Sequence, residues 1–119
     1  MGTVTNYRDL LVWQRRMDLV ERIYRIAQKL PDTERWGLTS QMCRAAVSVP
    51  ANIAEGYGRQ STGEYRHFLS IGRGSLSELE THLLLCQRLG YLETKEVASL
   101  LSEVEEILKM LSTLISKIH

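Results

Sequence analysis

Long apolar runs, prolines and aromatic residues are all scarce in this chain of 119 residues. No apolar run approaches the roughly 20 residues that a membrane-spanning helix needs, and the N-terminal residues lack the apolar segment of a secretion signal. We therefore expect a cytoplasmic protein without membrane association. Hydrophobic residues make up 44% of the chain and charged residues 24%, a composition typical of one folded domain and not of a disordered segment.

Residues that commonly carry chemistry are also few. Cys43 and Cys86 are the 2 cysteines, and neither belongs to a CxxC pair, so reduced and buried thiols are expected. Metal-binding helical bundles place Glu-x-x-His on two helices, and only Glu64 and His67 show that spacing. No serine-nucleophile motif is present. The sequence thus predicts no metal, no cofactor and no catalytic activity.

Helical periodicity is the dominant pattern that the chain does contain. Apolar residues recur every three or four positions in four segments, and no alternating pattern typical of strands competes. Pro31 and Gly90 fall between segments and act as stop signals. Long helices joined by short loops pack antiparallel to their neighbours. We expect a single domain over residues 1–119, an all-α, antiparallel, up-down-up-down four-helix bundle, with helices at about residues 7–30, 38–59, 62–89 and 94–118.

The first predicted helix carries two apolar stripes, more than one bundle face requires. One stripe consists of Leu10, Trp13, Met17, Val20, Tyr24 and Ala27. The other consists of Val12, Leu19, Ile23, Ile26 and Leu30. If one stripe faces the core, the other is either part of a broad arc buried inside the monomer or a subunit interface. On the second interpretation, the Val12 to Leu30 stripe is the interface and the protein is a homo-oligomer.

Basic residues recur every seventh position on the same helix. Arg8, Arg15, Arg22 and Lys29 have this spacing, and Arg25 lies beside them. A ridge of this kind is either an ordinary solvated face or, when an oligomer repeats it, a surface for nucleic-acid phosphates. The formal net charge of only +1 makes the outcome depend on assembly.

The second predicted helix combines small residues, an internal proline and a polar stripe. Pro50 should kink the helix, and neighbouring alanines should let another helix approach closely. The polar stripe consists of Gln41, Arg44, Ser48, Asn52, Glu55 and Arg59. It is either a solvated face with a Glu55–Arg59 pair or a hydrogen-bonded network at a subunit or ligand surface. Further on, Gly72 and Gly74 lie within the third predicted helix, where close packing would offset their low helix propensity.

Two long motifs resemble a known family. Residues 38–56 (LTSQMCRAAVSVPANIAEG) and residues 74–80 (GSLSELE) resemble bacterial four-helix-bundle proteins encoded in intervening sequences of large-subunit ribosomal RNA genes. That family includes the accessory variability determinant of diversity-generating retroelements. The resemblance spans about residues 6–118, and it implies a homo-pentameric ring with RNA or DNA, or a protein such as a reverse transcriptase, as partner. The retroelement proteins are strongly basic, whereas this chain is nearly neutral.

Two functional hypotheses follow. The first is a non-catalytic, homo-oligomeric accessory of a nucleic acid or ribonucleoprotein. Its candidate nucleic-acid contacts are Arg8, Arg15, Arg22, Arg25, Lys29, Arg44, Arg59 and Arg73. The alternative is a structural adaptor ring that binds another protein without touching nucleic acid. Its candidate contacts are the polar residues Gln41, Ser48, Asn52 and Glu55.

Overall fold

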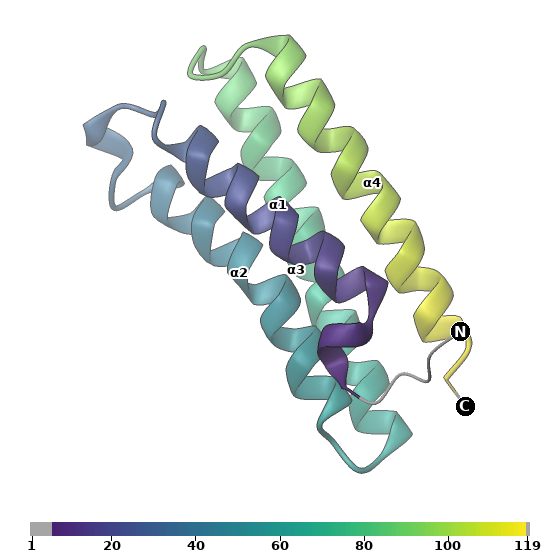
Figure 1. Cartoon of the computed structure of the whole chain (residues 1–119). Helices are drawn as coiled ribbons and strands as arrows, with labels where there is room; N and C mark the ends of the chain where they lie inside the picture. The colour runs from purple at the N-terminus through teal and green to yellow at the C-terminus, as the bar shows by residue number, and fades with distance from the viewer. Residues whose placement is uncertain (1–5, 119) are drawn as a thin grey trace.

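The computed structural model describes residues 6–118 and is all-helical over that range (Figure 1). Its four α-helices are α1 (Leu11–Ala27), α2 (Leu38–Tyr57), α3 (Thr62–Arg88) and α4 (Thr94–Ser116). Two short 3-10 turns, η1 (Tyr7–Asp9) and η2 (Asp32–Glu34), precede α1 and α2. No strand occurs between residues 6 and 118. None of the helices in this range is long and apolar enough to cross a membrane.

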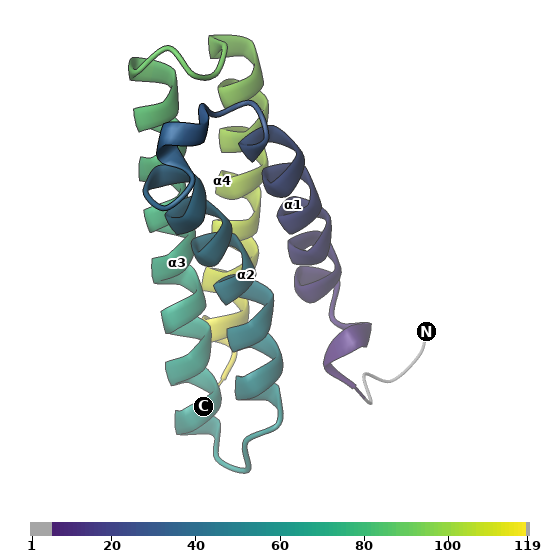
Figure 2. The same ribbon diagram turned by 90° about the vertical axis from the view of Figure 1, so that its left-hand side faces the viewer.

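Contacts between helices show that neighbours run antiparallel. Along the α1–α4 seam, Arg22 contacts Ser99 and Lys29 contacts Glu96, so the numbering rises in α1 as it falls in α4. Two views at right angles show the four helices aligned roughly along one long axis (Figures 1 and 2). The arrangement is consistent with a four-helix bundle. The structure is of one chain, and the pentameric ring stays a prediction.

The first helix begins later than its apolar periodicity predicts. Asn6 Oδ1 accepts a hydrogen bond from the backbone N–H of Arg8 at 3.0 Å and so caps η1. Leu10 then adopts an extended backbone with ψ of 124°, which separates η1 from α1. The helix ends at Ala27, and the Leu30 N–H closes a tighter turn onto the Ala27 carbonyl. A prediction of one helix over residues 7–30 is therefore too long at both ends.

The two apolar stripes of α1 differ in how much of each is buried. All five predicted interface residues are buried inside the monomer, namely Val12, Leu19, Ile23, Ile26 and Leu30. The interface assignment is therefore wrong for them. On the other stripe, Ala27 is buried and Leu10, Trp13 and Val20 pack partly against the core, whereas Met17 is 42% exposed and Tyr24 is 48% exposed. The core-facing arc of α1 is therefore broad, and Tyr24 keeps its polar group in contact with solvent.

The second and third helices approach closely where small residues face each other. A Cβ atom at Gly56 would lie only 2.8 Å from the Phe68 Cβ, and one at Gly72 would lie 3.6 Å from the Val49 carbonyl oxygen. Pro50 is buried at this level of α2. The predicted close packing is thus confirmed at Gly72 but wrong at Gly74, where a Cβ would meet no atom of residues 6–118 within 4 Å.

Candidate functional site

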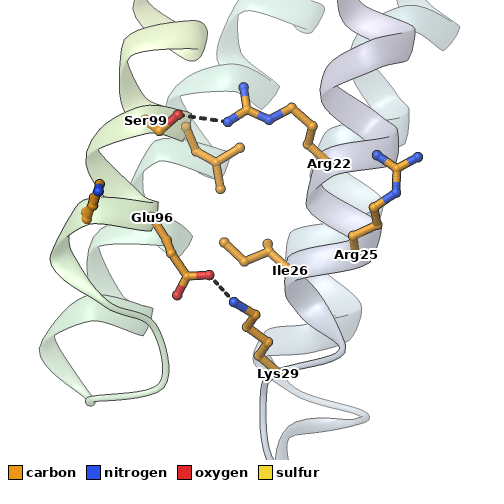
Figure 3. A pocket seen from close by; sticks show the side chains of 8 residues that line it. Arg22, Arg25, Ile26, Lys29, Glu96 and Ser99 are labelled. Carbon is orange, nitrogen blue, oxygen red and sulfur yellow. Dashed lines mark hydrogen bonds and ion pairs between the residues drawn. The ribbon is translucent and has the colours of Figure 1, made fainter.

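A basic pocket of about 470 Å³ lies between the C-terminal half of α1 and the N-terminal half of α4 (Figure 3). Three of the predicted nucleic-acid contacts line it, Arg22 and Arg25 from α1 and Lys29 from the turn that follows α1. A fourth cation, Lys95, joins them from the first turn of α4. Sequence reasoning missed Lys95 because it is an isolated basic residue, and only the antiparallel packing of α4 on α1 brings it to this pocket.

Two polar bridges cross the seam, and apolar side chains lie between them. Arg22 Nη2 donates a hydrogen bond to Ser99 Oγ at 2.9 Å, and Lys29 forms an ion pair with Glu96. Figure 3 shows Ile26 between these two bridges, and Leu100 also lines the pocket. The pocket therefore combines cationic walls with an apolar lining.

Glu96 is held in place by its own helix as well as by Lys29. Its carboxylate accepts a hydrogen bond from the Glu93 backbone N–H at 3.3 Å, as part of a capping box at the start of α4. The hydrogen bond from Lys29, and then the one from the Glu93 backbone, lower the pKa of Glu96. The carboxylate therefore stays ionised at neutral pH and offsets one of the four positive charges.

The remaining cations of the pocket keep donors for a ligand. Arg22 spends one N–H on a neutral serine hydroxyl. Arg25 and Lys95 are exposed, and neither has a hydrogen-bonding or ion-pairing partner among residues 6–118. With four cations and one carboxylate lining it, the pocket carries a net positive charge and should attract anions.

The other members of the predicted basic ridge do not join this pocket. Arg15 Nη2 lies 2.6 Å from Glu106 Oε1, and Arg15 Nε lies 3.6 Å from Glu103 Oε1, so two carboxylates offset its charge. Arg8 belongs to η1, where its Nε donates to Asn6 Oδ1 at 3.3 Å. Of the predicted basic ridge, Arg22, Arg25 and Lys29 therefore line the pocket, and Arg8 and Arg15 do not.

The three weaker candidates from other helices also lie apart from the pocket. Arg59 pairs with Glu55, and its guanidinium carbon lies 4.9 Å from the centre of the Phe68 ring. Arg73 Nη1 donates to Ser112 Oγ at 3.4 Å across the α3–α4 seam. Arg44 lines a different pocket, between α2 and α3.

That second pocket, of about 450 Å³, contains part of the polar α2 stripe. Its lining consists of Gln41, Arg44, Ala45 and Ser48 from α2 and of Ser75 and Glu78 from α3. Ser48 Oγ and Ser75 Oγ share a hydrogen bond of 2.8 Å, and Asn52 Nδ2 donates to Ser48 Oγ at 2.9 Å. Glu55 and Arg59, one end of the stripe, form the predicted i,i+4 pair instead. The Glu55–Arg59 pair is therefore confirmed, and a role of the Ser48–Asn52 network at a subunit or ligand surface stays a prediction.

A buried arginine is the charged residue that sequence reasoning overlooked. Arg16 is 0% exposed, and none of its Nε, Nη1 and Nη2 atoms has a hydrogen-bond partner among residues 6–118. Burial lowers the pKa of Arg16 to about 9, and the nearby Glu103 carboxylate opposes that shift. Its position was readable in the sequence, because Val12, Arg16, Leu19 and Ile23 follow one another at steps of four, three and four.

Thiol and metal chemistry have little support in the described part of the chain. Burial raises the pKa of Cys43, and it raises that of Cys86 to about 11, so thiolates are disfavoured at neutral pH. Residues 6–118 contain no group of three or more His, Cys, Asp or Glu side chains that could hold a metal ion. Nothing in these residues shows a catalytic centre.

Fold and site together define a small helical-bundle protein with a basic pocket on one seam. The model of the 23S rRNA-intervening sequence protein family matches residues 8–113, and the chain belongs to this family. The chain is also similar to a crystal structure from Bacteroides thetaiotaomicron, a protein of unknown function from the S23 ribosomal protein family. The TM-score is 0.82 at 25% sequence identity, covering 88% of this chain and 98% of the other. No curated protein gives a significant match.

Proposed function

We propose that this chain is a non-catalytic, homo-oligomeric accessory protein that binds nucleic-acid phosphates through the α1–α4 pocket. The observation that carries the proposal is the convergence of Arg22, Arg25, Lys29 and Lys95 on one pocket that holds a single carboxylate, Glu96. Arginine and lysine supply most contacts to phosphate oxygens in nucleic-acid complexes. The family description, which ties its members to 23S ribosomal RNA genes, favours an RNA or ribonucleoprotein as partner.

Oligomerisation would turn a weak site into a useful one. A single pocket can neutralise only a few phosphates, and each neutralised phosphate contributes about 0.7 to 0.9 to the log-log salt dependence of binding. A ring repeats the pocket once per subunit, so several contacts act on one strand without any new residue. The exposed side chains of Met17 and Tyr24 on the outer stripe of α1 replace the buried stripe as candidate subunit contacts.

Fluorescence anisotropy with labelled RNA at about 50 mM salt tests the proposal. The variant Arg22→Gln with Arg25→Gln removes two pocket cations and should weaken binding for all sequences alike. Its salt slope should fall by about 0.7 to 0.9 for each phosphate that this pair of arginines no longer neutralises. The matched control is Arg66→Gln with Arg73→Gln, which removes two arginines from α3 outside the pocket.

Retention of wild-type affinity and slope by the control would assign the binding to the pocket. Equal weakening by both double variants would show that overall charge, and not this pocket, binds the RNA. Absence of any binding by the wild-type protein would remove the proposal and leave the protein-adaptor alternative.

The α2–α3 pocket favours that alternative as a second candidate function. It brings Arg44 and Glu78, charges of opposite sign from different helices, to one pocket above a hydrogen-bonded floor of Ser48 and Ser75. Mixed charges with hydroxyl groups suit a polar segment of another protein. If the adaptor function holds, Arg44→Ala should lose a cross-linked protein partner that the Arg22→Gln, Arg25→Gln variant retains.

A further inference from the structure

We infer that the α1–α4 pocket takes an unpaired nucleotide of a single-stranded nucleic acid, with the base against the apolar wall between the two bridges and a phosphate at the arginines. This inference rests on the proposed function and narrows its substrate class. The residues that carry it are the two bridges, the apolar side chains between them and the cations around them.

The apolar lining separates this pocket from a plain phosphate site. A phosphate group is strongly hydrated and gains nothing from the apolar wall of the gap, where the edge of Ile26, 8% exposed, lies among the alkyl stems of Arg22 and Lys29 (Figure 3). A ligand that uses the whole pocket must therefore present both an anion and an apolar face. An unpaired nucleotide does so, because its base has a free face that packs on protein side chains.

The two bridges limit what can enter the pocket along the seam. Its volume of about 470 Å³ is within the range for small-ligand sites. The Arg22–Ser99 bridge and the Lys29–Glu96 bridge reach α4 at Ser99 and Glu96, which are about 4.5 Å apart along that helix at 1.5 Å per residue. A duplex keeps its bases stacked and paired, so it can touch only the outer cations of the pocket.

The phosphate should lie on the side of Arg22 and Arg25. Lys29 is already paired with Glu96, whereas Arg22 contacts only a neutral hydroxyl. Arg25 is one turn further along α1 and exposed, so both guanidinium groups can reach one phosphate. The Ser99 hydroxyl adds a neutral hydrogen-bonding group beside the base position.

The test compares three probes of equal length on the intact protein by fluorescence anisotropy at about 50 mM salt. They are single-stranded RNA of about 12 nucleotides, the same strand with abasic sites, and the corresponding duplex. The intact strand should bind about fivefold or more tighter than the abasic strand, which has the same phosphates, because one base–protein contact is lost per pocket. It should also bind tighter than the duplex.

Some results would overturn the inference alone, and others would overturn the proposed function with it. Equal binding of the abasic and intact strands would show a phosphate-only site, and equal or tighter binding of the duplex would show that the pocket does not select unpaired bases. Tighter binding to anionic phospholipid vesicles than to any RNA probe would assign the pocket to a lipid. No binding of any probe would remove the inference together with the proposed function.

A pocket-filling variant separates the base contact from the charge contact. Ser99→Leu fills the space between the bridges with an aliphatic side chain and keeps all four cations, so it should bind the intact and abasic strands alike. Ser102→Leu is the matched control, since Ser102 is also exposed on α4 but does not line the pocket. It should keep the preference for the intact strand. Loss of that preference in the control alone would contradict the assignment, and thermal melts establish that both variants fold.

Discussion

At the scale of single residues, Arg16 brings a charge into the apolar face of α1, and its donors have no acceptor among residues 6–118. The Glu103 carboxylate lies near Arg16, but its Oε1 atom pairs with Arg15 Nε at 3.6 Å. Replacing buried charged groups by apolar ones of similar volume is often neutral or stabilising by about 1 to 4 kcal/mol. We expect Arg16→Met to raise the free energy of unfolding within that range, as measured by urea denaturation.

Arg15→Met provides the comparison for this prediction. Arg15 is half-exposed and paired with Glu103 and Glu106, so its loss should change stability by no more than about 1 kcal/mol. If Arg16→Met instead lowers stability by more than Arg15→Met does, the buried guanidinium has an acceptor in solution, and Glu103 is the carboxylate to test next.

His82 gives the fold a dependence on pH. Its side chain is 6% exposed and its Nδ1 has no hydrogen-bond partner among residues 6–118. Burial lowers the pKa of His82, although the Glu78 carboxylate acts in the opposite direction. Between that lowered pKa and about 6.5, the unfolded chain binds a proton that the folded chain does not, so stability falls as pH falls through this window.

The measurement is the free energy of unfolding at several pH values between about 7 and 5. The variant His82→Leu should show a shallower decline toward acid than the wild-type protein. The matched control is His67→Asn, which changes an exposed histidine of the same helix and should decline as the wild type does. A His82→Leu curve parallel to the wild-type curve would contradict the role of burial.

How much of the site was predictable depends on how far apart its residues lie in the chain. Local spacing, which helix geometry fixes, is enough to predict the Glu55–Arg59 pair. It also predicts that Arg22, Arg25 and Lys29 lie close together near the end of the first helix. Lys95 reaches the same pocket only because α4 packs on α1, and no local pattern carries that contact. Arg15 likewise pairs with Glu103 and Glu106 only because α4 packs on α1, so the sequence alone could not separate it from the basic ridge.

At the scale of elements, periodicity predicted four helices and placed both ends of α2, α3 and α4 within two residues of the observed termini. It also identified two apolar stripes on α1. Periodicity alone does not say which stripe faces inward, because both satisfy the helical spacing. Side-chain polarity supplies that information, since Trp13 and Tyr24 retain exposed or partly exposed surface while the aliphatic stripe is buried. The extended backbone of Leu10 separates η1 from α1, and the apolar spacing does not reveal this break because it continues across Leu10.

Glycines in two helices should respond to alanine in opposite directions. Gly56→Ala would place a Cβ 2.8 Å from the Phe68 Cβ, so it should lower the free energy of unfolding by about 1 to 3 kcal/mol through overpacking. Gly74→Ala fills open space on α3 and should raise it by about 0.5 to 1 kcal/mol through helix propensity. Urea denaturation of both variants measures the two effects. A loss of stability in Gly74→Ala would instead indicate that α3 meets another surface at Gly74.

At the scale of the whole molecule, the distribution of apolar surface bears on assembly. The formal net charge is only +1, so long-range attraction to nucleic acid is weak for one chain. Repetition of the pocket in an oligomer would compensate for this weak attraction. The proposed nucleic-acid binding therefore depends on the proposed ring. The candidate subunit contact in such a ring is the outer stripe of α1, formed by Met17 and Tyr24. These two residues expose apolar area at a seven-residue spacing along one helix face.

Sedimentation equilibrium should give the wild-type protein a mass of about five times the 13.6 kDa of one chain. Met17→Asp with Tyr24→Asp should reduce it to the monomer mass and leave the thermal melt of the monomer cooperative, because both side chains lie at the surface of the subunit. Ile23→Asp serves as the contrast, since Ile23 is 0% exposed and a charge there should unfold the subunit. A wild-type mass of one chain at micromolar concentration would remove the outer stripe as an interface, and the salt dependence of RNA binding would then have to come from the few phosphates that one pocket can reach.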